Sequence, residues 1–252
     1  MPPPRTPCPF RRPAVLALTF CAAWLSAGPV RAAAPVPAAP VQNETGAFID
    51  QVVAAYGGKA ALGKVKAYRM EGIISSKMQG QGPLLRLFSR PNRLRVVLQY
   101  PGGAEVRVVD GDQGWRSDAT GKLAPVNNFL LGAMVAQAVR ANLPWVLDER
   151  RAEAHLTAQG GKLQGIVLPL GNGLTLTAWV DPATHLILHS STDLDMPGMN
   201  TEFITDYTDF RAVNGVMFPF HEDNYASGQS IGETVIMNVD TQPKVTESDF
   251  RP

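Results

Sequence analysis

The chain lacks the residues and motifs from which most catalytic sites are built. Its only cysteines, Cys8 and Cys21, lie within the first 32 of its 252 residues. Removal of that segment leaves no disulfide, no thiolate nucleophile and no cysteine-based metal site. The motifs of zinc proteases, serine hydrolases and phosphate-binding loops are also missing from the sequence. We therefore predict no metal site, no cofactor and no enzymatic activity.

The chain also lacks a strong net charge of either sign. Removal of residues 1–32 takes away four arginines and no acidic residue, which leaves 19 basic against 22 acidic residues. A surface with a net charge near −3 is a poor match for nucleic acid or for anionic lipid. We predict no nucleic-acid partner.

A long hydrophobic run is missing as well. Three arginines precede Ala14–Gly28, an apolar run of 15 residues, which is shorter than the ~20 residues that span a bilayer. Small residues at Val30 and Ala32 are typical of a signal-peptidase site. We predict that residues 1–32 are a cleaved signal peptide, the alternative being a membrane anchor. Export without disulfides is compatible with the bacterial periplasm.

The rest of the chain divides into a linker and one domain. Residues 33–43 are rich in proline and alanine and cannot build a core. Residues 44–252 suit a single, mainly β domain. Short runs of alternating apolar residues, separated by turn signals, predict about eleven strands between Ala67 and Val239. One of them, Arg93–Gln99, has Leu94, Val96 and Leu98 on one face, and another is Glu153–Ala158. Asp110-Gly111 and Asn214-Gly215 predict hairpin turns. Short connections favour an antiparallel sheet in meander order.

Two segments have helical spacing instead. Glu44–Tyr56 is followed by Gly57-Gly58, which ends a helix. Asn127–Leu147 is almost uncharged, has asparagine at its start as an N-cap, and contains Pro144, which ends or kinks it. A helix this apolar must cover an apolar surface. It either closes a core, which periodicity alone favours, or acts as a lid over a ligand cavity.

The most informative stretch runs from Arg90 to Trp115. It contains Arg90-Pro91-Asn92, then Pro101, then Asp110-Gly111 and finally Trp115. The order and approximate spacing resemble the core of the LolA-type periplasmic lipoprotein carriers and of the wider outer-membrane lipoprotein-sorting family. The resemblance is specific only over this stretch, although the helix–sheet layout extends it to most of the domain.

The resemblance implies a fold and a function. The fold is mainly β with a few helices, a curved antiparallel sheet forming an incomplete (half) β-barrel capped by lid helices. Such a monomer binds acyl chains of lipoproteins or other lipids. It passes them from an inner-membrane donor protein to an outer-membrane acceptor protein. The alternative is an envelope sensor or adaptor of the same fold. A sensor is expected to carry a second interaction domain, so we favour the carrier.

The resemblance also suggests a ligand site. It implies that Arg90 donates hydrogen bonds to backbone groups of the lid, a role that suits the five donors of a guanidinium. We expect eight apolar side chains to contact the ligand with it: Phe88, Leu98, Trp115, Phe129, Leu130, Met134, Trp145 and Trp179.

Overall fold

The computed structural model describes residues 41–118, 120–157, 161–196 and 199–252. The predicted signal peptide and residues 33–40 of the predicted linker lie outside these ranges. The chain separates into two compact units, and only the second, Ala38–Pro252, contains described residues. The description below concerns that unit.

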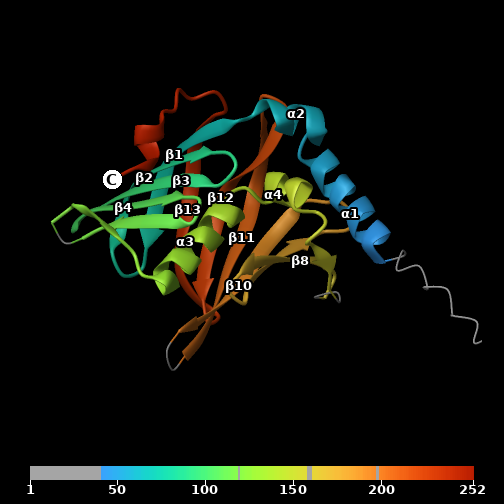
Figure 1. The fold of residues 1–252 in the computed structure, drawn as a ribbon. Coiled ribbons are helices and arrows are strands. Elements are labelled where there is room, and N and C mark those ends of the chain that lie inside the picture. Colours follow the sequence, from blue (N-terminus) through green and yellow to red (C-terminus); the bar gives the residue numbers. More distant parts are fainter. Residues whose placement is uncertain (1–40, 119, 158–160, 197–198) are drawn as a thin grey trace, which may run out of the picture. The chain divides into compact units, whose positions relative to one another are not determined.

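The described residues form one antiparallel sheet of 13 strands (Figure 1). Its order is β6-β5-β4-β3-β2-β1-β13-β12-β11-β10-β9-β8-β7. The strands are β1 (Ala67–Ser76), β2 (Gly80–Ser89), β3 (Arg93–Tyr100), β4 (Gly103–Asp110), β5 (Gln113–Ser117), β6 (Leu123–Pro125), β7 (His155–Leu156), β8 (Gln164–Gly171), β9 (Leu174–Val180), β10 (Ile187–Met196), β11 (Met199–Val213), β12 (Val216–Ala226) and β13 (Gln229–Asp240).

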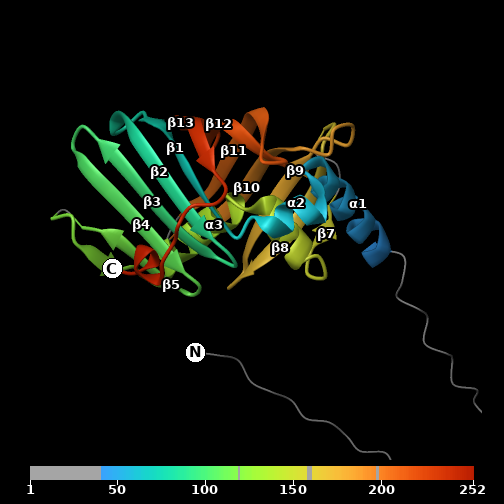
Figure 2. The ribbon, with the colours of Figure 1, turned by 90° about the horizontal axis from the view of Figure 1, so that it is seen from above.

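The sheet consists of two meanders joined by the pairing of β1 with β13. The predicted meander order therefore holds within each half, but the contact between the first and last strands was not predicted. The free edges are β6 and β7, which follow one another in sequence and are connected by two helices. Figure 2 shows the strands curving around these helices. The predicted incomplete, helix-capped barrel is confirmed.

Two strands depart from the sequence-based expectation. β6 was not predicted, because three residues are too few to show an alternation. The expected strand Glu153–Ala158 is reduced to His155–Leu156, and Ala158 lies outside the described residues. These short strands are the two edges of the sheet.

The N-terminal helices are α1 (Val41–Ala55) and α2 (Gly58–Lys64). α1 begins three residues before the predicted start. The predicted break is confirmed at Gly57, whose φ of 111° is unfavourable for residues with a Cβ. A Cβ there would lie 2.0 Å from the carbonyl oxygen of Gly215, so the break packs directly on the β11–β12 turn.

The predicted helix Asn127–Leu147 is two helices, α3 (Asn128–Arg140) and α4 (Leu143–Glu149), bent by 94°. Asn127 is the N-cap, and its side chain accepts a hydrogen bond of 2.9 Å from the Leu130 amide. The break precedes Pro144, which lies in the first turn of α4. No single described helix is long and apolar enough to span a bilayer, although α3 and α4 meet that test as a bent pair.

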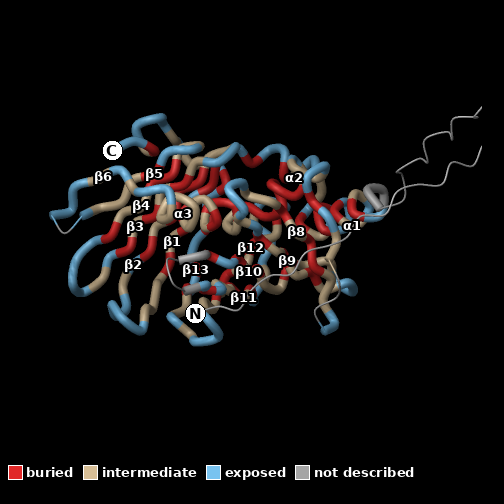
Figure 3. Tube along the Cα trace, turned by 60° about the horizontal axis from the view of Figure 1, so that its bottom comes forward, coloured by how far each residue is buried: buried red, intermediate tan, exposed pale blue. Residues whose placement is uncertain are grey.

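Apolar residues separate onto the two faces of the sheet. The concave face carries the main core, to which α1, α3 and α4 contribute buried side chains. On β3 the inward residues Leu94, Val96 and Leu98 are buried, as their alternation predicted. A smaller cluster on the convex face joins Leu87 and Val108 to Phe250 near the C-terminus. Figure 3 shows buried segments (red) within the strands and helices, and exposed turns (pale blue) at the strand ends.

Candidate ligand cavity

A cavity of about 510 Å³ lies between the concave face and one side of α3. Ala133, Ala136, Gln137 and Arg140 of α3 line it, a spacing that places all four on one helical face. The sheet contributes apolar side chains, among them Leu98. Three arginines and one glutamate also line it, namely Arg86, Arg107, Arg140 and Glu222, and we call it the basic cavity.

Arg86 on β2 and Glu222 on β12 form a buried ion pair across the two intervening strands, β1 and β13. Nη1 of Arg86 donates to Oε1 of Glu222 at 2.8 Å, and Nη2 donates to Oε2 at 3.0 Å. Each side chain is only 7% exposed. The two-pronged geometry is the strongest arrangement available to an arginine and a carboxylate.

Each member of this pair stabilises the ionised form of the other. Burial alone would raise the pKa of Glu222, but Arg86 and, to a lesser extent, Arg140 outweigh it and lower that pKa. Burial would likewise lower the pKa of Arg86, and the negative charge of Glu222 reverses the shift. Both groups are therefore charged at neutral pH, inside a largely apolar interior.

The other two arginines differ in their partners. Arg107 on β4 pairs with Glu105 and donates a hydrogen bond of 3.3 Å to the Gln137 side chain on α3. The side chain of Arg140, the last residue of α3, forms no hydrogen bond or ion pair with any described residue. It is half-buried and lines the cavity, where Glu222 attracts it without forming an ion pair.

A second space, of about 1090 Å³, lies on the other side of α3. We call it the strand-end groove, because the β2–β3 turn at Asn92, the β4–β5 turn at Gly111 and the β8–β9 turn at Asn172 line it, together with Phe129 of α3. Leu194 on β10 lines both spaces. α3 thus separates two spaces that meet at one residue.

Arg90 lies at the edge of the strand-end groove and joins the sheet to the helices. Its Nη2 pairs with Oε1 of Glu149, the last residue of α4. Its backbone amide donates to the Lys66 carbonyl at 2.9 Å. The resemblance implied a contact with lid backbone carbonyls, whereas this partner is a carboxylate side chain. The contact still ties the Arg90 turn to the helical cover.

The predicted ligand residues do not line one common site. Leu98 lines the basic cavity, and Phe129 lines the strand-end groove. Phe88, Met134 and Trp145 are buried in the main core, and Leu130 packs against it. Trp145 stacks on Tyr68, with ring centroids 5.9 Å apart, and its Nε1 donates to the Leu62 carbonyl at 2.9 Å.

Two predicted ligand residues point away from both spaces. Trp115 packs on the convex face with the cluster around Phe250. Trp179 is also on the convex side, where its ring lies 5.6 Å from that of His189. Alternation accounts for both, because their neighbours Gly114 and Ala178 occupy the inward positions. We leave Trp115 and Trp179 out of the proposed site.

Sequence reasoning missed the charged residues of the basic cavity. The signal was present, because Arg86 alternates in phase with Leu84 and Phe88, and Glu222 with Phe218 and Phe220. A charge at an inward position of a buried strand requires an inward partner. Without the sheet topology, however, residues 136 positions apart could not be recognised as that pair.

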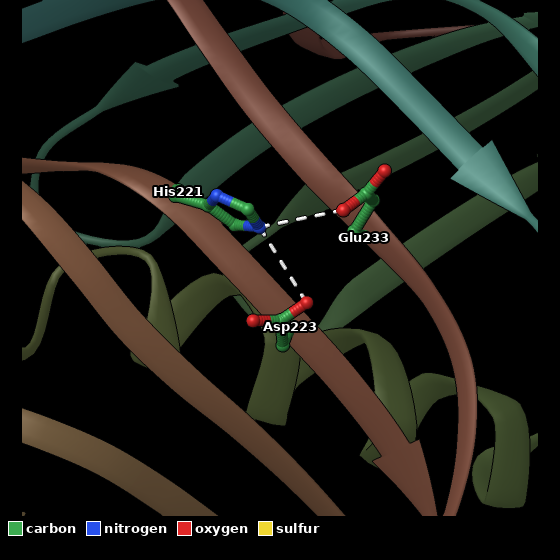
Figure 4. Close-up of side chains that lie close together, drawn as sticks. All are labelled: His221, Asp223 and Glu233. Atoms are coloured by element: carbon green, nitrogen blue, oxygen red, sulfur yellow. Dashed lines mark ion pairs between the residues drawn. The ribbon is translucent and has the colours of Figure 1, made fainter.

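One cluster on the convex face has the composition of a metal site. Figure 4 shows His221 between Asp223 on its own strand and Glu233 on β13. Its Nε2 lies 3.5 Å from one carboxylate oxygen of each. Two ligands of a tetrahedral Zn²⁺ are about 3.3 Å apart, so the three residues could hold such an ion. A protonated imidazole between two carboxylates has the same geometry and needs no ion. The cluster alone therefore gives no ground for placing a metal.

Solved structures identify the fold. A domain from Vibrio parahaemolyticus described as an outer membrane lipoprotein-sorting protein superposes with a TM-score of 0.51, at 10% identity, over 83% of this chain and 97% of its own. A LolA superfamily protein from Nitrosomonas europaea gives the same score and identity, over 85% and 99%. The chain has the LolA fold. No family profile and no curated protein sequence matches it.

The likeness extends over nearly the whole length of both LolA-fold structures. At 10% identity this likeness establishes the fold alone. The chemistry of the site must be inferred from the side chains of this chain. The buried pair Arg86–Glu222 and the unpaired Arg140 are observations on this chain alone.

Proposed function

We propose that the protein is a periplasmic carrier that binds the acyl chain of a lipoprotein or another lipid in the basic cavity. It receives this cargo from an inner-membrane protein and delivers it to an outer-membrane acceptor, with no catalytic step. The observation that carries the proposal is the cavity itself, about 510 Å³ of space between the concave sheet and α3. That volume lies within the range of about 300–1,000 Å³ typical of ligand sites.

The lining supports an acyl ligand. Leu84, Val96 and Leu98 of neighbouring strands offer apolar surface, and the small side chains of Ala133 and Ala136 on α3 leave room beside it. Each methylene moved from water into such a site gains about 0.8 kcal/mol. A chain of ten methylenes would gain roughly 8 kcal/mol before the costs of ordering are subtracted. The LolA fold, shared with a protein described as sorting lipoproteins, adds support.

Filling the cavity tests this proposal. We expect Ala133→Trp to weaken binding of a fluorescent fatty acid by about tenfold or more, because overpacking a filled site costs about 1–3 kcal/mol. Ala54→Trp is the matched control, since Ala54 is an exposed residue on α1. Fluorescence titration gives the affinities. Mass spectrometry of protein purified from a bacterial periplasm should also detect bound lipid. Equal affinities of the two variants, together with lipid-free preparations, would refute the carrier.

The Arg90–Glu149 ion pair should control release. We expect Arg90→Leu to speed dissociation of a bound fatty acid, because it frees the end of α4 from the β2–β3 turn. The loss in unfolding free energy should stay below about 1 kcal/mol, as for other partly exposed pairs. Stopped-flow release measures the effect. Glu149→Gln should reproduce it, and the double variant should add nothing further. Unchanged release in both single variants would remove the pair from the mechanism.

A further inference from the structure

The basic cavity carries more positive charge than its apolar lining leads one to expect. Arg86, Arg107 and Arg140 line it, against Glu222 as the one acidic residue in the lining. The two nitrogens at the tip of Arg86 each donate a hydrogen bond to Glu222. Arg107 is held at the wall by Glu105 and Gln137. The remaining positive charge is that of Arg140.

Arg140 lies in the lining of the proposed ligand cavity. It lies in the inward row of α3 with Ala133, Ala136 and Gln137. It also lines a small apolar cavity of about 30 Å³, together with Arg86 and Glu222, so these three groups mark the junction of two spaces. A basic residue at the end of a helix is stabilised by the helix dipole. That effect explains a positive charge at this end of α3, but not its orientation into a cavity.

The neighbouring groups leave a place for an anion. Glu222 attracts Arg140, but both of its oxygens already accept hydrogen bonds from Arg86. Nε of Arg86 is buried and has no hydrogen-bond partner in the part of the chain that the structure describes. A buried donor without a partner and a half-buried cation without a counter-ion each cost free energy. An incoming acceptor group with a negative charge would offset the cost at Arg140.

We propose that the cargo of this cavity is an anionic amphiphile, whose carboxylate or phosphate group is bound by Arg140 while its hydrocarbon chain lies along the apolar wall. This inference rests on the proposed carrier function and adds to it the charge of the ligand. The overall negative charge of residues 33–252 would not itself attract such a ligand, so recognition depends on the arginines inside.

A series of head groups on one chain tests the charge. Dodecanoate, dodecyl phosphate, dodecanol and dodecylamine displace the neutral dye N-phenyl-1-naphthylamine from the full-length mature protein, below their micelle concentrations. We expect the better anion to bind about tenfold or more tightly than dodecanol, since charged hydrogen bonds exceed neutral ones. Dodecylamine should bind most weakly. The order of dodecanoate and dodecyl phosphate tells which anionic group the site accepts.

Substitutions then locate the effect. Arg140→Met should abolish the preference for anions, so that dodecanoate and dodecyl phosphate bind no more tightly than dodecanol to this variant. Arg69→Met is the control, since Arg69 pairs with Glu71 and lines none of the three cavities described. Equal binding of anionic and neutral chains, or a preference that survives Arg140→Met, would overturn this inference and leave the carrier intact. Failure of the dye and of all four amphiphiles to bind would overturn the carrier as well.

Discussion

Glu222→Leu is expected to lower the free energy of unfolding by about 3–5 kcal/mol, because removal of one partner leaves a buried charge without compensation. The abandoned group is Arg86, whose side chain is 7% exposed and whose two terminal nitrogens both bond to Glu222. Among the described residues, the only other hydrogen-bond partner of the Arg86 side chain is Met70 Sδ, at 3.9 Å from Nη1, which cannot replace a carboxylate. Urea unfolding followed by circular dichroism measures the loss.

The double variant Arg86→Met/Glu222→Leu separates pairing from packing. It removes both charges and should recover most of the lost stability, as apolar replacement of buried ion pairs often does. Asp209→Asn is the surface control. Its partner Arg211 is 55% exposed, so the change should stay within about 0.5 kcal/mol. If Glu222→Leu lowered the free energy of unfolding by less than about 1 kcal/mol, water would have to reach Arg86, and the basic cavity around it would be hydrated.

The same pair should be visible in the pH dependence of stability. The pKa of Glu222 is lowered in the folded protein relative to its ordinary value of 4.5, because Arg86 and Arg140 outweigh the effect of burial. Its contribution is therefore fully present above about pH 4.5 and is lost as the pH falls through the lower, folded value. Below pH 4.5 the wild-type free energy of unfolding should fall more steeply than that of the double variant.

The local structure could be predicted from turns and alternation. Asp110-Gly111 and Asn214-Gly215 marked two hairpins that the structure contains. Leu94, Val96 and Leu98 were placed correctly on one face because a strand repeats every two residues. The pairing of β1 with β13 had no local signal, since it joins the two ends of the domain. That pairing brings Arg86 close to Glu222. The ion pair in the lining of the basic cavity could therefore not be predicted from the sequence either.

The roles of the three tryptophans predicted to contact the ligand could not be inferred from their residue type. Trp115, Trp145 and Trp179 were given one role, yet alternation directs two of them to the convex side. The bend after Arg140 turns α4 and places Trp145 against Tyr68. Alternation was visible in the sequence and could have excluded Trp179. Pro144 correctly predicted the break between α3 and α4, but the 94° angle of the bend depends on how the two helices pack, and composition does not encode it.

Trp145→Ala should destabilise the protein by about 3–5 kcal/mol, as for other large aromatic side chains removed from a core. Trp145 is 4% exposed and packs against Tyr68 and Phe218, each with its ring centroid 5.9 Å away. Its indole nitrogen also connects α4 to the Leu62 carbonyl on α2. One side chain thus holds α4, α2 and the sheet together, and chemical denaturation will measure its contribution.

Two variants separate this packing role from the ligand contact that the sequence suggested. Trp145→Phe keeps an aromatic ring in the core and loses the indole hydrogen bond, so its cost should be smaller, about 1–2 kcal/mol. Trp179→Ala, on the convex side, should cost about 1 kcal/mol, because that ring is only half-buried. Fatty-acid affinity, measured where each variant is folded, should change little in Trp145→Phe. If Trp145→Ala instead kept its stability and lost all binding, Trp145 would belong to the ligand site and the core around Tyr68 would not depend on it.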